Sequence, residues 1–196
     1  MNYLAHLYFS DRTPEAAVGS LAGNFFKGSL ERHPPQLRPA LALHRAIDAF
    51  TDFHPDVTAT RRLIFESAGH YGGVVLDVFY DHLLSMSWSR YAREPLQSFA
   101  GEMYGLLRAG RALIPSAFAP VVDSMIEHDW LTHYGSDTGW IGTLQRMQQR
   151  LPGMDASRAA TGVLDVREEV ETRFHAFFPE LQELVRERST PAAQLP

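Results

Sequence analysis

The segment 43–56, LHRAIDAFTDFHPD, places histidine and aspartate side chains one helical turn apart. His44 and Asp48 are four residues apart, and Asp52 follows after four more. Residues four apart lie on one face of a helix, so the imidazole and the first carboxylate project together. Imidazole nitrogens and carboxylate oxygens are common metal ligands. The spacing therefore indicates that this helix face could hold a metal ion.

Two other apolar segments repeat the four-residue spacing. Asn2 and His6 lie in MNYLAHLYF, and Asp77 and Asp81 lie in VVLDVFYDHLLSMSW, where His82 follows directly. A buried, unpaired charge costs on the order of several kcal/mol, so carboxylates in so apolar a segment need partners. We expect four side chains to form a metal site where three helices face one another in the core of a bundle: His6, His44, Asp48 and Asp81.

Each of these residues also has a simpler structural interpretation. A single histidine on an apolar face is more often a hydrogen-bonded core residue than a ligand. Asp48 and Asp81 could instead pair with Arg45 or another arginine, or cap the end of a helix. Asp52 lies just before a predicted helix end, and His54 precedes a proline and could simply close that turn.

The remaining histidines give weaker signals. His128 and Asp129 are adjacent, as are the paired ligands of histidine-aspartate metal phosphohydrolases, but so short a motif has little specificity. The histidines that lie near predicted breaks or on mixed faces are interpreted as surface or structural residues: His33, His70, His128, His133 and His175.

The elements that must position these residues are predicted to be helices. Apolar residues recur at three- and four-residue spacing, as at Leu37, Leu41 and Ile47, rather than alternating. Clusters of proline and glycine divide the chain into about seven or eight helices. We predict an all-α fold in which residues 1–188 form a single compact helical bundle and one domain, followed by a frayed tail, 189–196.

The composition is that of a globular protein. The chain has 196 residues, of which 45% are hydrophobic and 21% charged, and its net charge of -5 gives no reason to expect nucleic acid as a partner. Cysteine is absent, which excludes disulfides, a thiolate nucleophile and a thiolate zinc site, so any metal must be held by nitrogen and oxygen. We expect no membrane segment and no secretory leader, and therefore a cytoplasmic protein.

Five blocks of the sequence resemble the acyl carrier protein phosphodiesterase (acyl carrier protein hydrolase) family. They run in order from the first residue to Leu181: MNYLAHLYFS, GSLAGNFFKG, LALHRAIDAFTDFHPDV, LDVFYDHLLSMSW and VETRFHAFFPEL. The resemblance implies a helical, HD-domain-like fold, distantly related to histidine-aspartate metal phosphohydrolases, and a divalent ion, Mn²⁺ or Mg²⁺. It also implies hydrolysis of the phosphodiester that joins 4′-phosphopantetheine to a serine of holo acyl carrier protein, which gives apo carrier protein and free 4′-phosphopantetheine.

The resemblance extends the predicted site. It adds position 24, where the family pattern has an aspartate and this chain has Asn24, whose amide brings no negative charge. The residues expected to be catalytic and to bind metal are then His6, Asn24, His44, Asp48 and Asp81. Those expected to support them or to transfer protons are Asp77, His82 and Asp52.

Basic residues are expected to bind the substrate. The candidates for contact with phosphate or substrate are Arg45, Lys27, Arg61 and Arg62. Because carrier proteins of this kind are acidic, we also expect a local basic surface made by Lys27, Arg32, Arg38, Arg61 and Arg62. Two alternatives stay open: a metal-dependent phosphohydrolase acting on a nucleotide or another small phosphoester, and a non-catalytic binder of acyl carrier protein.

Overall fold

The structure is a computed structural model that describes residues 1–189. Within these residues the chain forms thirteen α-helices and five short 3-10 helices, and no strand. The all-α prediction is confirmed, but the predicted number of helices is too low. Three of the α-helices are single turns of four residues at changes of chain direction, which apolar periodicity cannot resolve. The predicted tail falls outside the described residues except for Ser189, the last residue of the final helix.

The helices follow one another with short connections. The α-helices are α1 (Tyr3–Tyr8), α2 (Pro14–Ala22), α3 (Arg38–Phe53), α4 (Pro55–Leu63), α5 (Phe65–Ala68), α6 (Gly72–Met86), α7 (Trp88–Tyr91), α8 (Leu96–Ala109), α9 (Ala119–Glu127), α10 (Trp130–His133), α11 (Asp137–Gln148), α12 (Ala156–Asp165) and α13 (Arg167–Ser189). The 3-10 helices are η1 (Gly23–Phe25), η2 (Leu30–Arg32), η3 (Pro35–Leu37), η4 (Gly69–Tyr71) and η5 (Arg111–Leu113).

Polar side chains begin several of these helices. The hydroxyl oxygens of Thr13 and Ser136 and the carboxylate of Asp155 each accept a backbone amide hydrogen at the start of α2, α11 and α12. Such caps satisfy amides that have no partner inside the helix. The Nδ1 atom of His54 accepts from the amide of Asp56 in the same way at α4, so the prediction that His54 closes this turn is confirmed.

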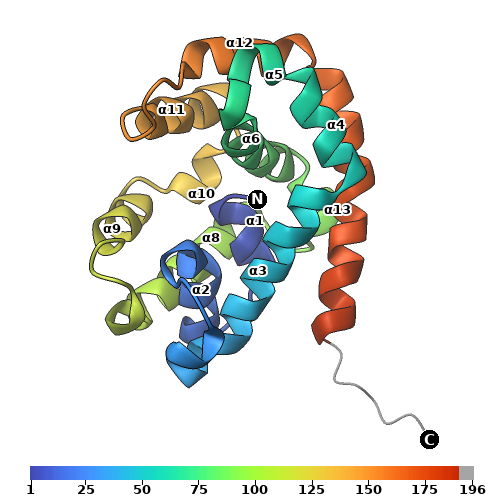
Figure 1. Ribbon diagram of the computed structural model, residues 1–196. Helices are drawn as coiled ribbons and strands as arrows, with labels where there is room; N and C mark the ends of the chain where they lie inside the picture. Colours follow the sequence, from blue (N-terminus) through green and yellow to red (C-terminus); the bar gives the residue numbers. More distant parts are fainter. Residues whose placement is uncertain (190–196) are drawn as a thin grey trace, which may run out of the picture.

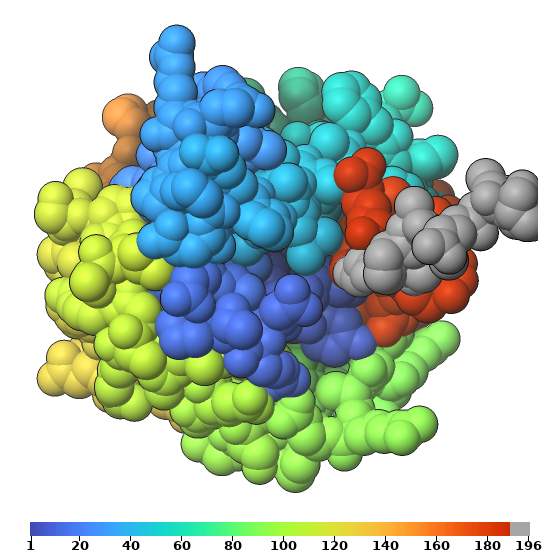
Figure 2. Space-filling view, turned by 90° about the horizontal axis from the view of Figure 1, so that it is seen from below, coloured from blue at the N-terminus to red at the C-terminus, as the bar shows by residue number. Residues whose placement is uncertain are grey.

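The short helix α1 lies at the centre of the molecule, between α3 and α6 (Figure 1). Seen from below, the segments of α3 and α8 flank the first helices on opposite sides (Figure 2). The side chains of Leu4, Ala5 and Leu7 are fully buried there, and the buried apolar residues form one continuous cluster around them. The helical conformation of α1 therefore depends on packing against its neighbours, because a six-residue segment does not form a stable helix by itself in water.

None of the helices within residues 1–189 combines the length and the apolar character needed to cross a membrane.

Candidate metal centre

His6 from α1 and His44 and Asp48 from α3 meet in one cluster. Each offers a ligand atom, and the three atoms lie within 4.8 Å of one another. One Asp48 oxygen is 3.0 Å from Nε2 of His6, and the other is 3.1 Å from Nε2 of His44. Both imidazoles are buried, whereas the Asp48 side chain is 33% exposed. The sequence prediction that these three residues meet is confirmed, and the cluster is open to solvent on its carboxylate side.

The tautomer of His44 is fixed by a backbone contact. Its Nδ1 atom lies 2.8 Å from the carbonyl oxygen of Ser20, and a carbonyl can only accept a hydrogen bond. The Nδ1 atom of His44 therefore carries the hydrogen, and in the neutral ring Nε2 presents its lone pair to Asp48. A lone pair and a carboxylate oxygen are both acceptors, so a proton or a metal cation is needed between them.

His6 has no hydrogen-bond partner among the described residues for either ring nitrogen, and Nε2 of His44 has none. The two rings are stacked, with centroids 3.9 Å apart and planes at 20°. Burial, with a smaller contribution from His44, lowers the pKa of His6 to about 4 despite the opposing effect of Asp48. His6 is therefore neutral at pH 7. The Nε2 lone pair of His44, the neutral His6 ring and one carboxylate form a ligand set that fits a divalent ion.

Asp48 is ionised at neutral pH. Burial raises the pKa of its carboxyl, but the imidazoles of His44 and His6 outweigh burial and hold the pKa well below its usual range. The cluster thus places the negative charge of Asp48 beside the neutral imidazole of His6. This negative charge favours binding of a cation.

A close approach by the backbone of η1 holds the His44 ring in place. A Cβ atom at Gly23 would lie 2.3 Å from Cγ of His44, so only glycine fits against the imidazole. Earlier in the same segment, a Cβ atom at Gly19 would lie 2.6 Å from Cβ of Ala40, which shows how closely α2 and α3 pack. Sequence reasoning missed Gly23, although a glycine inside the apolar block GSLAGNFFKG was a signal of close packing.

Asp81 does not join the cluster. Its carboxylate is fully buried and accepts the amide hydrogens of Leu4 and Ala5, at 2.7 and 3.1 Å. Burial raises the pKa of Asp81 to about 7, and the two amides oppose this. The structure therefore favours the simpler interpretation, a cap of the first turn of α1, over a metal ligand. By fixing α1, Asp81 also sets the position of His6.

Asp77 and His82 have partners that explain them without catalysis. Asp77 accepts a hydrogen bond from the terminal ammonium of Met1, at 2.8 Å. Burial lowers the pKa of this ammonium, but Asp77 and the nearby Asp48 raise it by more. The Nδ1 atom of His82 donates to the carbonyl of Tyr134, at 2.7 Å, and its Nε2 atom lies 3.1 Å from the Arg167 guanidinium. Both ring nitrogens are thus engaged outside the cluster.

Asn24 lies in η1, directly after the glycine that contacts the His44 ring. Its side chain is exposed. The fold thus brings Asn24, whose side chain is exposed, to the same part of the molecule as the buried His44 ring. Its predicted role as a ligand stays a prediction.

Known proteins resemble this chain over nearly its whole length. The family model described as acyl carrier protein phosphodiesterase matches residues 1–181. The chain belongs to the acyl carrier protein phosphodiesterase family. Relatives with this name from Salmonella agona (strain SL483) and Salmonella newport (strain SL254) are each 30% identical over 184 residues, covering 92% of this chain and 95% of theirs. No solved structure matches the chain significantly. The predicted family is confirmed, and the predicted likeness to the HD-domain fold stays a prediction.

Several of the basic residues predicted to bind substrate are engaged elsewhere in this phosphodiesterase family member. Arg45 donates to the carbonyl of Phe26, at 2.8 Å, which braces the chain after η1. Arg61 pairs with the Asp52 carboxylate, so Asp52 has an ion-pair role. Arg38 donates to backbone carbonyls of the segment before α3. The side chains of Lys27, Arg32 and Arg62 are exposed.

His128 and Asp129, the adjacent pair noted in the sequence, have separate partners. The Nδ1 atom of His128 lies 3.0 Å from the carbonyl of Ser124, whereas Asp129 accepts a hydrogen bond from the Tyr104 hydroxyl at 2.9 Å. This adjacent pair therefore engages two different parts of the fold, and the described residues form no metal-ligand group that includes it.

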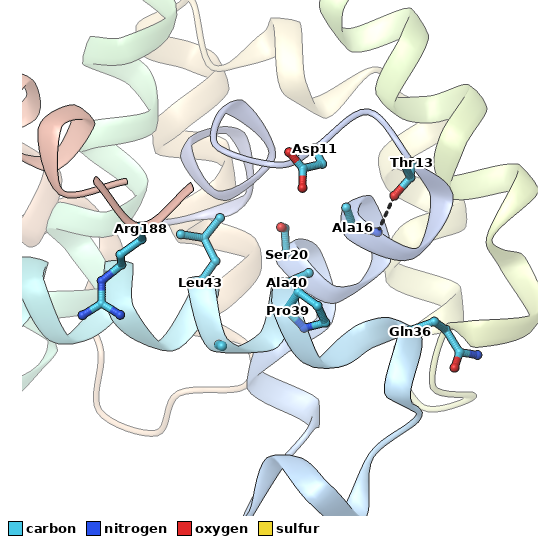
Figure 3. Close-up of a pocket in the computed structure, with 10 residues that line it drawn as sticks. Asp11, Thr13, Ala16, Ser20, Gln36, Pro39, Ala40, Leu43 and Arg188 are labelled. Atoms are coloured by element: carbon cyan, nitrogen blue, oxygen red, sulfur yellow. Dashed lines mark hydrogen bonds between the residues drawn. The ribbon is translucent and has the colours of Figure 1, made fainter. Parts of the chain in front are cut away.

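A separate hollow of about 530 Å³ lies over α2 and α3 (Figure 3). The side chains of Asp11 and Ser20 point toward one another across it. None of the three cluster residues lines this hollow. Its link to the cluster is the backbone of Ser20, whose carbonyl holds His44.

Proposed function

We propose that this chain hydrolyses the phosphodiester between 4′-phosphopantetheine and the serine of holo acyl carrier protein. The products are apo carrier protein and free 4′-phosphopantetheine. The observation that carries the proposal is the cluster of His6, His44 and Asp48, in a chain that matches a phosphodiesterase family over 181 residues. The buried ring nitrogens of this cluster without hydrogen-bond partners support a role in chemistry over a purely structural role in the core.

We also propose that the cluster holds Mn²⁺ or Mg²⁺. His6 and His44 would supply nitrogen ligands and Asp48 an oxygen, with the amide oxygen of Asn24 as a further candidate. Such an ion, when bound, makes water more acidic and neutralises charge on phosphoryl oxygens. The exposed side of Asp48 leaves room for a bulky protein substrate to approach.

The protein's own contacts prepare the ligands. The Ser20 carbonyl holds the hydrogen of His44 on Nδ1, so Nε2 is free to act as a ligand. Gly23 lets the backbone lie against the ring and fixes its plane. Asp81 ties α1 to α6 and so keeps His6 against His44. Such supporting contacts commonly change metal affinity by about 10- to 100-fold when removed.

Incubation of the purified protein with holo acyl carrier protein and Mn²⁺ tests the proposal. The mass of the carrier should fall by the mass of its prosthetic group, because the phosphodiester is cleaved. A parallel incubation with nucleotides and small phosphoesters separates this activity from general phosphohydrolysis. Turnover of nucleotides with an intact carrier protein would replace the proposed substrate with a small phosphoester.

Asn24 favours a second candidate, a protein that binds acyl carrier protein without cleaving it. The family pattern has a carboxylate at this position, and the amide lowers the negative charge available to a metal ion. Retention of holo carrier protein on the immobilised chain, with no product in the presence of Mn²⁺ or Mg²⁺, would support this candidate. Metal-dependent turnover would exclude it.

A further inference from the structure

A groove between α9 and α11 has no role in the site described above. Two hollows of about 250 and 360 Å³ share Ser124, Trp130 and Arg146 in their walls and thus form one depression. Tyr3 and Arg150 line the part of the depression nearest to α1. We call it the α9–α11 groove.

The lining of this groove combines apolar surface with hydrogen-bond donors. The Arg146 guanidinium lies over the Trp130 ring, 5.0 Å from its centroid, and also donates to the Thr143 hydroxyl. The side chains of Arg146 and Arg150 are exposed, and among residues 1–189 no carboxylate lies within 4.0 Å of either guanidinium. In a chain with a net charge of -5, two unpaired arginines beside aromatic rings favour a ligand that supplies acceptor oxygens and some apolar length.

The groove begins one helical turn from the metal cluster. Tyr3 lines the groove and His6 is three residues further along α1, so their Cβ atoms are about 5–6 Å apart. Ring contacts continue from there to η1: Tyr3 lies 6.1 Å from Phe118, and Phe118 lies 4.5 Å from Phe25, measured between centroids. Phe25 is 46% exposed and follows Asn24 directly. Both the cluster and the groove thus border the first turn of α1.

We propose that the α9–α11 groove binds the pantetheine arm of the substrate while its phosphate lies at the cluster. This inference rests on the proposed function. The arm is a chain with amide carbonyls, hydroxyls and methyl groups, and its length of about four residue-length units gives it a reach of about 14 Å. Arg146 and Arg150 donate to its carbonyl oxygens, and Tyr3 and Trp130 pack against its apolar parts.

Titration calorimetry with pantetheine, which has no phosphate, tests the groove apart from catalysis. Pantetheine should bind the wild-type protein, and Arg150→Ala should weaken binding by about tenfold or more, because a hydrogen bond to a charged donor is lost. Trp130→Phe should weaken it to a smaller extent. Arg108→Ala is the matched control, since Arg108 is also an exposed arginine and lies on α8, outside the groove. It should bind pantetheine as the wild type does.

Turnover of holo carrier protein provides the second measurement. Arg150→Ala should raise KM with little change in kcat, because the groove holds the arm rather than the reacting atoms. Equal pantetheine affinity in the wild type, Arg150→Ala and Trp130→Phe would overturn the proposal that the groove binds the pantetheine arm, even if holo carrier protein is still cleaved. Conversely, if pantetheine binds and the groove variants weaken this binding, but holo carrier protein is not cleaved, the role of the groove is supported and the proposed activity is contradicted.

Discussion

The protonation state of His6 links the cluster to stability. The pKa of His6 is about 4 in the folded protein, against an ordinary value of 6.5, chiefly because the ring is buried. Between these pH values the unfolded chain holds a proton on this residue that the folded protein lacks. The free energy of unfolding therefore rises with pH through this window, with a contribution from His6 of roughly 3 kcal/mol.

The variant His6→Gln isolates this effect. Its side chain does not titrate, so the extra loss of stability on acidification from about pH 6.5 to pH 4 should disappear. Urea unfolding without metal, at several pH values, provides the measurement. With Asp48→Asn introduced in both proteins, the carboxyl whose pKa His6 lowers is removed, and the other groups, including Asp81, titrate alike and cancel in the difference. Parallel pH profiles for wild type and variant would show that His6 is not held neutral by burial.

Asn24 has an exposed amide that can be replaced by a carboxylate without disturbing the core. Asn24→Asp adds a negative charge next to the cluster at almost the same volume, so ion affinity and turnover of holo carrier protein should increase. Without metal, repulsion from Asp48 should lower the melting temperature, and Mn²⁺ should restore it by a larger shift than in the wild type. Equal turnover and equal Mn²⁺-induced shifts in the two proteins would remove position 24 from the site.

At the scale of elements, the close contact between η1 and α3 is possible because residue 23 is a glycine and has no side chain. Gly23 has an ordinary helical backbone conformation, so alanine would be tolerated there except for the collision of its Cβ atom with the His44 ring. We predict that Gly23→Ala lowers the free energy of unfolding by about 1–3 kcal/mol and weakens Mn²⁺ binding, because overpacking displaces the ring.

Gly101→Ala and Gly105→Ala on α8 are the matched controls. Added Cβ atoms at these positions meet nothing within 4 Å, and alanine has the higher helix propensity. Both should therefore raise stability, by about 0.4–1 kcal/mol, and leave metal binding unchanged. Thermal unfolding and Mn²⁺ titration of the three variants separate steric displacement of His44 from a general effect of glycine replacement. Unchanged metal affinity in Gly23→Ala would contradict the role given to this contact.

The sequence predicts contacts within one helix better than contacts between helices. Four-residue spacing on a helix is local geometry, so the pairing of His44 with Asp48 could be predicted. To assign His6, the partner from α1, one had to use the family resemblance or assume which helices face one another. Asp81 has the same spacing from Asp77, yet its oxygens serve the amides of α1. Helix spacing defines a face but not the neighbour that the face meets, and the backbone contacts from Ser20 and Gly23 leave little trace in residue types.

At the scale of the whole molecule, net charge and local charge act in opposite directions on an acidic partner. The chain carries -5, so docking of an acidic carrier protein requires a local basic surface. Among the predicted residues of that surface, Arg61 is paired with Asp52, whereas Arg62 is exposed and has no carboxylate within 4.0 Å among the described residues.

Arg62→Glu therefore tests the surface without breaking an ion pair. It should raise KM for holo carrier protein and weaken the dependence of kcat/KM on salt, because long-range attraction is lost, while kcat stays nearly constant. Arg108→Glu on α8 makes the same change in net charge away from α4 and serves as the control. If both variants changed KM equally, overall charge rather than a docking surface at α4 would be responsible.

Binding of Mn²⁺, followed by the loss of the free ion's electron paramagnetic resonance signal, tests the central claim that His6, His44 and Asp48 form a metal centre. We predict saturable binding to the wild-type protein. Asp48→Asn and His44→Ala should weaken it by about 100-fold or more, because each removes a direct ligand, whereas Asp52→Asn should bind as the wild type does. Wild-type affinity in both Asp48→Asn and His44→Ala would contradict the claim and leave the cluster as a packing feature of α1 and α3.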